Sequence, residues 1–402
     1  MRSMLFSSVS NSGVRLTRLV QQVTLPQQSQ IFALFQSSFL AKVTKWKLIA
    51  GYYVVMKRIF DALSISCVVA FVSVASGAVA ADKTLLDTAV GTSGLIDAGN
   101  KGGIFIRELR VLSYNINGLP PPVKKGRGPH FERIAELLKE RRANGTQPHV
   151  VLIQEAFDGR TKIVAEKTGY KYVLYGPGRK DTSKLGRVHW AQQTRKPYMS
   201  FSDPQKFTGS GLMILSDFPI IEAFHKTFNS DECAGIDCLS NKSILFARIQ
   251  VPGVSEPVDI INSHFNSRSA AKAPKKISLR IHKRQADVLK WFIEKTSVGN
   301  PLILAGDFNT KQPARYEYFS KLMGLRDAGE KCVADTVTCT ISVDTKIDMV
   351  LYNTNDKHFF ENGSRVQVSP RFIERNFDEV INGKPLSDHL GYEVVYTFSS
   401  LP

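Results

Sequence analysis

The sequence predicts an α/β domain in which helices cover β-sheets. Short apolar runs, several rich in Val and Ile and bounded by Gly, Pro or Asn, recur from residue 105 onward. Amphipathic stretches with helical spacing lie between these runs. With 43% hydrophobic residues among 402, the chain can bury a large core, which excludes a disordered chain, a collagen-like repeat and a disulfide knot.

Eight apolar runs predict strands, in the order Arg110–Tyr114, Val150–Ile153, Gly211–Leu215, Ser243–Ile249, Val258–Ser263, Leu302–Ala305, Asp348–Tyr352 and Tyr392–Tyr396. The spacing of Phe131, Ile134 and Leu138 predicts a helix that ends before the Asn144-Gly145 stop. Residues 278–295 carry the same helical pattern. No internal repeat or strong linker follows residue 105, so we expect one domain over residues 105–402.

An export signal is predicted inside the chain rather than at its first residue. Met56-Lys57-Arg58 precedes an uncharged apolar run at 62–76, and Ala78-Val79-Ala80 then forms a small-x-small cleavage site. This order predicts a signal peptide over 56–80 and a secreted or periplasmic protein. We interpret residues 1–55 as an over-extended start or a disordered segment, and residues 81–104 as a lead-in.

Two other interpretations of the amino-terminal region stay open. Its Ser-rich, basic and acid-poor composition also fits a targeting presequence. An apolar run of this kind also fits an uncleaved membrane anchor, since about 20 apolar residues span a bilayer. The small residues at 78–80 favour cleavage over the anchor.

The positive charge of the chain is unevenly spread. The formal net charge is +17, with 53 basic and 36 acidic residues, which favours anionic partners. Residues 1–80 hold eight basic residues and one acid, which leaves 45 basic and 35 acidic residues in 81–402. The body is therefore only moderately basic, and its charge does not require nucleic-acid binding.

Four cysteines remain after removal of the predicted signal peptide. Cys67 lies in the apolar run, and the others form two close pairs, 233 with 238 and 332 with 339. Four cysteines allow three pairings. We expect the two local pairs because each closes a short loop in an oxidising compartment. The alternative is four free, buried thiols.

Polar residues recur where predicted strands end or begin. They are Asn115, Glu155, His264, Asp307 with Asn309, Asp348, and Asp388 with His389. Catalytic groups often lie at such junctions because the rigid sheet holds them in place. A single strand-end Asn or Asp is more often a turn former. Six such positions in one chain predict an active site.

The motifs that contain these residues resemble those of the endonuclease/exonuclease/phosphatase superfamily. They are Ser113-Tyr114-Asn115-Ile116-Asn117-Gly118, Ile153-Gln154-Glu155, Ser263-His264, Gly306-Asp307-Phe308-Asn309, Ile347-Asp348-Met349-Val350 and Ser387-Asp388-His389. The resemblance covers residues 113–389. It implies a four-layer α/β/β/α sandwich, with two packed mixed β-sheets flanked by helices and an active site at one end.

The resemblance implies a metal-dependent attack of water on a phosphodiester. Glu155 is a hard oxygen ligand for Mg²⁺, or for Mn²⁺ or another divalent cation. Asn115 is expected to share the metal shell or bind a phosphoryl oxygen, and Asp388 to add a metal contact. A cation at this place would neutralise the charge of the phosphodiester.

The remaining residues are assigned to the proton transfers and to positioning. His389 is the expected general base, because histidine titrates near neutral pH. Asp348 is expected to orient its imidazole. Asp307 and Asn309 are expected to position the water and a phosphate oxygen, and His264 to donate to the phosphoryl group or leaving oxygen.

The flanking segments resemble those of sphingomyelinase-type phosphodiesterases. Residues 233–242 place an Asp, an Asn and a Lys before a strand, and Gln154-Glu155-Ala156-Phe157-Asp158 matches the segment around the Glu. Lys242 and Asn241 are therefore predicted to contact the substrate, against the plain interpretation of a surface lysine. Many nucleases of the superfamily carry an acid where this chain has Asn117, which weakens the nuclease interpretation.

Two enzyme functions and one non-catalytic function are compatible with these motifs. The first is a secreted, monomeric Mg²⁺-dependent phospholipid phosphodiesterase similar to sphingomyelinase C. The second is an exported nuclease or other phosphoesterase, and the third a binding module that keeps the fold. Residues 178–208 carry cations and the aromatics Trp190, Tyr198 and Phe201. This segment fits a lipid surface, a nucleic-acid backbone or a solvated insertion.

Overall fold

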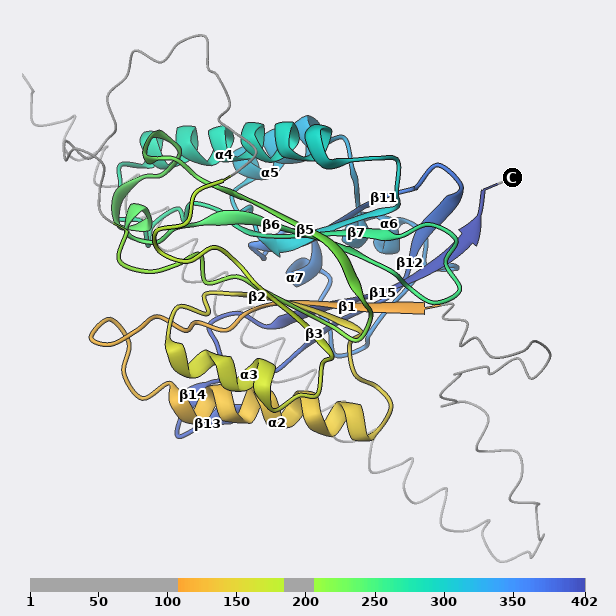
Figure 1. Ribbon diagram of the computed structural model, residues 1–402, viewed down its shortest axis with the longest axis horizontal. Helices are drawn as coiled ribbons and strands as arrows, with labels where there is room; N and C mark the ends of the chain where they lie inside the picture. Colours follow the sequence, from red (N-terminus) through yellow and green to blue (C-terminus); the bar gives the residue numbers. More distant parts are fainter. Residues whose placement is uncertain (1–107, 184–205, 402) are drawn as a thin grey trace, which may run out of the picture. The chain divides into compact units, whose positions relative to one another are not determined.

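In the computed structural model, which describes residues 108–183 and 206–401, two β-sheets pack face to face between layers of helices (Figure 1). The predicted four-layer α/β/β/α sandwich is therefore confirmed. The predicted signal peptide at 56–80, its flanking segments, and Trp190, Tyr198 and Phe201 lie outside the described residues. Among the described helices, none is long and apolar enough to cross a bilayer.

The first sheet has seven strands in the order β10-β12-β15-β1-β2-β4-β3. Their bounds are β1 Glu108–Asn115, β2 Val150–Gln154, β3 Tyr172–Tyr175, β4 Met213–Ser216, β10 Thr340–Ile341, β12 Val366–Asn376 and β15 Gly391–Ser400. At its centre β1 pairs in parallel with β2 and antiparallel with β15. Because β1 and β2 run the same way, their carboxyl ends reach the same edge of the sheet.

The second sheet has six strands in the order β5-β6-β7-β8-β11-β9. Their bounds are β5 Ile220–Thr227, β6 Ser243–Ile249, β7 Val258–His264, β8 Leu302–Asp307, β9 Arg326–Asp327 and β11 Asp356–Glu361. Strands β7 and β8 are parallel, and β11 pairs antiparallel with β8. A separate hairpin is formed by β13 Val380–Ile381 and β14 Lys384–Pro385.

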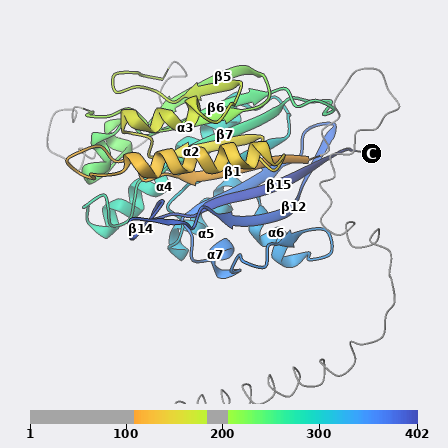
Figure 2. The ribbon, with the colours of Figure 1, turned by 90° about the horizontal axis from the view of Figure 1, so that it is seen from below.

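Helices cover the outer faces of both sheets. Their bounds are α2 Gly128–Ala143, α3 Ile163–Glu166, α4 Lys275–Thr296, α5 Pro313–Met323, α6 Ala328–Ala334 and α7 Asp348–Leu351, with short 3₁₀ turns η1 Gly159–Lys162, η2 Ser230–Glu232 and η3 Gly235–Leu239. Helices α2 and α3 lie on the seven-stranded sheet, and α4 and α5 on the six-stranded sheet (Figures 1 and 2). In Figure 2 helix α2 crosses in front of β1.

Three buried apolar clusters correspond to the three interfaces between these layers. The central cluster joins the inner faces of the sheets, for example Leu152 of β2 and Ile260 of β7. A second cluster packs Leu289 and Phe292 of α4 on the six-stranded sheet. A third packs Phe131 of α2 on the seven-stranded sheet. Strands β2, β7 and β8 are buried along their whole length, as expected for strands whose two faces are both covered.

Most predicted elements are present, with shifts at their ends. The helix predicted at 278–295 is α4, which begins at Lys275 and ends at Thr296. The strand predicted at Asp348–Tyr352 is wrong, because these residues form the short helix α7 and the turn after it. The strand that follows is β11, which begins at Asp356.

Both predicted disulfides are confirmed. Cys233 bonds to Cys238 and Cys332 to Cys339, with Cα atoms 5.2 and 4.9 Å apart. The sulfur atoms are buried in the packed domain. Each bond closes a short loop, with its cysteines 5 and 7 residues apart in sequence, and Cys332 and Cys339 belong to the central apolar cluster.

Candidate active site

The carboxyl ends of two parallel strand pairs, β1 with β2 and β7 with β8, meet at one end of the sandwich. Asn115 ends β1, and Glu155 follows β2 directly. In the other sheet His264 ends β7 and pairs in register with Asp307, which ends β8. Residue Asp356, at the start of β11, pairs with Asp307 from the other side. Two sheets therefore bring polar side chains from distant parts of the chain to one place.

The His389 imidazole is held by the Asp356 carboxylate. Its Nδ1 lies 3.1 and 3.0 Å from the two carboxylate oxygens of Asp356. Burial alone would lower the pKa of His389, but the carboxylates of Asp356 and Asp307 outweigh burial and raise this pKa to about 10. Burial alone would raise the pKa of Asp356, yet His389 and then Arg375 hold it at about 2.

The prediction that Asp348 orients the imidazole of His389 is wrong. Asp348 is exposed in the first turn of α7, eight residues before the carboxylate that makes the contact. The reason is topological, since β11 pairs with β8 and so places Asp356 beside Asp307. Asp348 lies on the connection that leads into that strand.

Asp307 connects the two halves of the site. Its Oδ2 accepts a hydrogen bond from Asn115 Nδ2 at 3.0 Å. The same oxygen lies 3.5 Å from His264 Nε2 and 3.7 Å from His389 Nε2. Its Oδ1 accepts from the backbone N–H of Asn309 at 3.1 Å. The carboxylate is buried, so each of these contacts is made away from bulk water.

Glu155 is the carboxylate of this group that retains the most exposure, with 19% of its side chain accessible. Its backbone is left-handed, with φ of 57°, at the sharp turn that follows β2. Burial raises the pKa of Glu155, an effect that Lys242 and Asn115 oppose and Asp307 reinforces. Gly118 N–H donates to the Glu155 carbonyl at 3.0 Å, which fixes the turn against the loop after β1.

The segment with His389 is tied to the end of β1. Ser387 Oγ donates to the Asn115 carbonyl at 2.6 Å and accepts from the His389 N–H at 3.3 Å. Asp388 points elsewhere, because its side chain is 64% exposed and lies 3.9 Å from Lys124 Nζ. A metal contact from Asp388 therefore stays a prediction.

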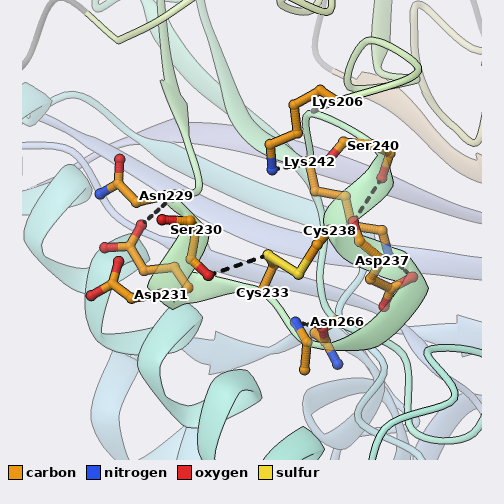
Figure 3. Close-up of a disulfide and its surroundings, with 12 residues drawn as sticks. Lys206, Asn229, Ser230, Asp231, Cys233, Asp237, Cys238, Ser240, Lys242 and Asn266 are labelled. Carbon is orange, nitrogen blue, oxygen red and sulfur yellow. Dashed lines mark hydrogen bonds and ion pairs between the residues drawn. A yellow bond between two sulfur atoms is a disulfide. The ribbon is translucent and has the colours of Figure 1, made fainter. Parts of the chain in front are cut away.

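A buried lysine contacts the imidazole of His264. Lys242 Nζ lies 3.1 Å from His264 Nε2, donates to the Phe265 carbonyl at 2.9 Å and pairs with Asp237 Oδ1 at 3.3 Å. Burial and then Lys242 lower the pKa of His264 to about 3, so the ring is neutral and its Nε2 accepts. Figure 3 shows Asp237 within the loop that the Cys233–Cys238 disulfide closes, and Lys242 near it. Donation by His264 to a phosphoryl oxygen stays a prediction.

The side chains of the other two predicted site residues, Asn241 and Asn309, donate hydrogen bonds to backbone carbonyls. Asn241 Nδ2 donates to the carbonyls of Gly178 and Asp181, at 2.8 and 3.0 Å. Asn309 Nδ2 donates to the Phe265 carbonyl at 3.1 Å. Their amide hydrogens thus hold neighbouring loops, and a contact of either side chain, or of the buried Lys242, with substrate stays a prediction.

A family model for the endonuclease/exonuclease/phosphatase family matches residues 112–389, from β1 to His389. The chain belongs to this family. The match includes every residue placed at the site above, from Asn115 to His389. The predicted superfamily resemblance is therefore confirmed.

Relatives within the family include named sphingomyelinases. A sphingomyelinase of Mycobacterium bovis is 25% identical over 70% of this chain and 51% of its own length. Sphingomyelinase C 2 of Leptospira interrogans is 23% identical over 72% and 42%. The chain thus spans about half the length of the curated relatives it matches. The solved structure of SmcL covers 72% of this chain and 99% of its own, with TM-score 0.50 and 18% identity, which shows the fold.

The side chains of this family member suit a hard divalent cation. Glu155 and Asp307 are carboxylates on facing strand ends, and Asn115 lies beside them, with Nδ2 donating to Asp307 and Oδ1 accepting from the Asn117 N–H. Repulsion between the carboxylates of Glu155 and Asp307 contributes to the raised pKa of Glu155. A nearby cation would relieve this repulsion. Asp307, Asp356 and His389 also offer ligand atoms within 4.8 Å of one another. Of these three, Asp356 already binds His389 and Arg375, and a metal contact from Glu155 stays a prediction.

Three residues that contribute to the site were absent from the sequence-based set. Asp356 orients His389, Arg375 Nη2 lies 3.4 Å from Asp356 Oδ2, and Asp237 pairs with Lys242. The Asp356 signal was weak, because β11 begins Asp-Lys-His and reads as polar. The strand is recognisable only from Phe359 and Phe360, which follow a turn rich in Asn.

Proposed function

We propose that the protein is a phosphoric diester hydrolase in which water attacks phosphorus in line with the leaving oxygen. The His389–Asp356 pair carries this proposal, because an imidazole hydrogen-bonded to a carboxylate is the arrangement of an oriented base. Its free nitrogen, Nε2, faces Asp307 rather than the apolar core. Family membership supports the same reaction class.

The site residues have distinct roles in the proposed reaction. His389 Nε2 takes the proton of the attacking water, and Asp356 holds the ring and stabilises the imidazolium that forms. Asp307 accepts a hydrogen bond and orients the water. Lys242 supplies positive charge behind His264, 3.1 Å from its Nε2, toward the developing negative charge.

Glu155, with Asp307 and Asn115 beside it, would hold the divalent cation. When bound, the cation supplies Lewis-acid stabilisation of the phosphoryl oxygens and positive charge that opposes protonation of His389. Mg²⁺ fits the carboxylate and amide oxygens of this group, and Mn²⁺ is the nearest alternative.

We propose a phospholipid as the substrate, as in the sphingomyelinases that the chain resembles. Loops at the site end expose apolar side chains. Val123, after β1, is 67% exposed, Tyr352, before β11, is 73% exposed, and Val380, in the hairpin before His389, is 63% exposed. Together with cations such as Lys124, these side chains suit a lipid–water interface.

The substrate is tested with the full chain against sphingomyelin vesicles, lysophospholipid, phosphoinositide, plasmid DNA and RNA, each with and without Mg²⁺. We expect Mg²⁺-dependent release of phosphocholine from sphingomyelin. Hydrolysis of DNA or RNA that weakens steeply with salt, with no release from vesicles, would instead establish the nuclease alternative. No hydrolysis of any substrate would refute the enzyme itself.

Lipid docking is tested by Val123→Ser, Tyr352→Ser and Val380→Ser combined. The triple variant should lose vesicle hydrolysis while keeping hydrolysis of a small soluble phosphodiester, because the site residues are unchanged. Val298→Ser is the matched control, since Val298 is 66% exposed but precedes β8 at the opposite end of the sandwich. Equal losses on both substrates would contradict docking.

We also propose that the protein is exported after cleavage near Ala81 and acts as a monomer. The Ala78-Val79-Ala80 sequence supports the cleavage site. Amino-terminal sequencing of the exported protein should begin near Ala81, and mass measurement in solution should give one chain. A mature protein that retains residues 1–55 would contradict this.

A further inference from the structure

Arg315 is a fully buried arginine next to the site whose hydrogen bonds all go to uncharged groups. It lies in the first turn of α5 and is 1% exposed. Its Nη1 donates to the Asn266 carbonyl at 2.7 Å and to the Asn309 carbonyl at 3.3 Å. Its Nη2 donates to Ser278 Oγ of α4 at 2.7 Å. One side chain therefore joins two loops and two helices.

The two loops that Arg315 joins carry catalytic groups of the six-stranded sheet. Asn266 lies two residues after His264, and Asn309 lies two residues after Asp307. Asn309 has a left-handed backbone, with φ of 54°, and in that conformation its N–H donates to Asp307 Oδ1. The same residue donates from Nδ2 to the Phe265 carbonyl, which also accepts from Lys242. The position of Asn309 thus affects both strand ends.

Burying the charged guanidinium of Arg315 without an ion pair is unfavourable, so filling space does not explain an arginine at this position. Within residues 108–183 and 206–401, no carboxylate forms an ion pair with Arg315, and its Nε is buried without a hydrogen-bond partner. Burial lowers the pKa of Arg315 to about 10, while Asp237 raises it and Asp307 adds to that. Desolvating a cation costs several kcal/mol unless other groups compensate, so an apolar residue would serve better as mere filling.

We propose that Arg315 is a positioning residue that sets the placement of Asp307 and His264 by holding the Asn309 turn and the loop after β7. The five-donor planar guanidinium can bind several carbonyls in fixed directions, which a lysine cannot reproduce. This role rests on the proposed hydrolase function. It predicts an effect on the chemical step, because a shift of about 1 Å in groups that meet the transition state costs on the order of 10²-fold in rate.

The chain provides a matched control in Arg248. This arginine lies on β6 of the six-stranded sheet and has a side chain that is 11% exposed. It pairs with Asp259 at 2.7 Å and donates to the Thr296 carbonyl at 3.1 Å. Asp259 is near the start of β7, so this contact lies at the opposite end of the strand from His264. Arg248→Met removes a buried guanidinium without touching the catalytic loops.

The experiment compares Arg315→Met, Arg315→Lys, Ser278→Ala and Arg248→Met in the full chain, on the substrate that the wild-type protein hydrolyses. We expect Arg315→Met to lower kcat about 10- to 100-fold with KM changed less than about threefold. Arg315→Lys should recover part of kcat, and Ser278→Ala, which removes one anchor of the guanidinium, should give a smaller loss in kcat. Arg248→Met should lower Tm while keeping kcat.

Hydrogen exchange provides a readout that does not depend on activity. In Arg315→Met and Ser278→Ala the amides of Asn266 and Asn309 should exchange faster, while that of Ile116, at the end of β1, stays unchanged. If Arg315→Met does not fold, Ser278→Ala and Arg315→Lys still decide the question. Unchanged kcat and unchanged exchange in these variants would overturn the proposal. An inactive wild-type protein with the predicted exchange changes would refute the hydrolase function instead.

Discussion

The two halves of the active site differ in how far their side chains are withdrawn from water. In the half from the six-stranded sheet, Lys242 and His264 are each 4% exposed and Asp307 is 2% exposed. In the half from the seven-stranded sheet, the side chains of Glu155 and His389 are 19% and 17% exposed. The first half forms a buried frame of hydrogen bonds, which Asn115 of the other sheet joins through Asp307. Glu155 and His389 are the more accessible groups of the site.

This difference predicts which substitutions act on chemistry and which on the frame. An exposed group can change partners during the reaction, whereas a buried group must keep its own because unpaired burial is costly. Losing an exposed group should therefore remove a step and leave the fold intact. Losing a buried group should shift the exposed groups and lower stability as well.

His389→Ala should give the largest loss of activity. Removing a general base typically costs about 10²–10⁴-fold in rate, because the attacking water keeps its proton. We expect kcat to fall by this amount, with Tm and Mg²⁺ binding by calorimetry close to wild type. Wild-type turnover on any substrate in this variant would contradict the role of His389.

Asp356→Asn should lower kcat by on the order of 10²-fold, since the imidazole loses its orienting carboxylate. Because the Asp356 carboxylate raises the pKa of His389, the variant should show a lower His389 pKa. NMR titration of the His389 ring measures this shift. A His389 pKa equal to that of the wild type would show that Asp356 is not its partner in solution.

Glu155→Gln should weaken Mg²⁺ binding because a carboxylate charge leaves the cation site. The rate at low Mg²⁺ should fall about tenfold, and raising Mg²⁺ should restore part of it. The same titration on His389→Ala serves as the control, since metal cannot replace a base. A Glu155→Gln rate that is low and independent of Mg²⁺ would exclude the metal role.

Asp348→Ala should have the smallest effect, with less than about a twofold change in kcat. This exposed residue of α7 makes no contact with His389, whose partner is Asp356. The comparison with Asp356→Asn separates the predicted partner from the observed one. A large loss in Asp348→Ala with little change in Asp356→Asn would reverse the assignment.

The sequence predicted the strand ends well and the partners across them poorly. Asn115, Glu155, His264 and Asp307 follow strands whose apolar runs are easy to recognise. Asp356 was missed because β11 contains Lys357 and His358, whose polarity conceals a buried strand. Lys357 can be buried because its Nζ pairs with Asp327 at 3.1 Å and donates to the Val350 and Leu351 carbonyls, contacts that no local pattern reveals.

Lys242 illustrates the same limit in the opposite direction. A lysine next to a predicted strand is expected at the surface or at a phosphate. Its ammonium group is instead inside the frame, paired with Asp237 and donating to the Phe265 carbonyl. The motif indicated this residue, but its neighbours depend on how the disulfide loop folds back onto the loop after β7 (Figure 3).

Gly118 determines how closely two backbones approach beside the site. A β-carbon at this position would overlap the carbonyl oxygen of Glu155 and press on the Thr161 side chain 2.8 Å away. The turn after β1 thus approaches the turn after β2 so closely that only a glycine fits at residue 118. The spacing of the turns that carry Asn115 and Glu155 is therefore a property of the main chain, and any side chain at residue 118 would push them apart.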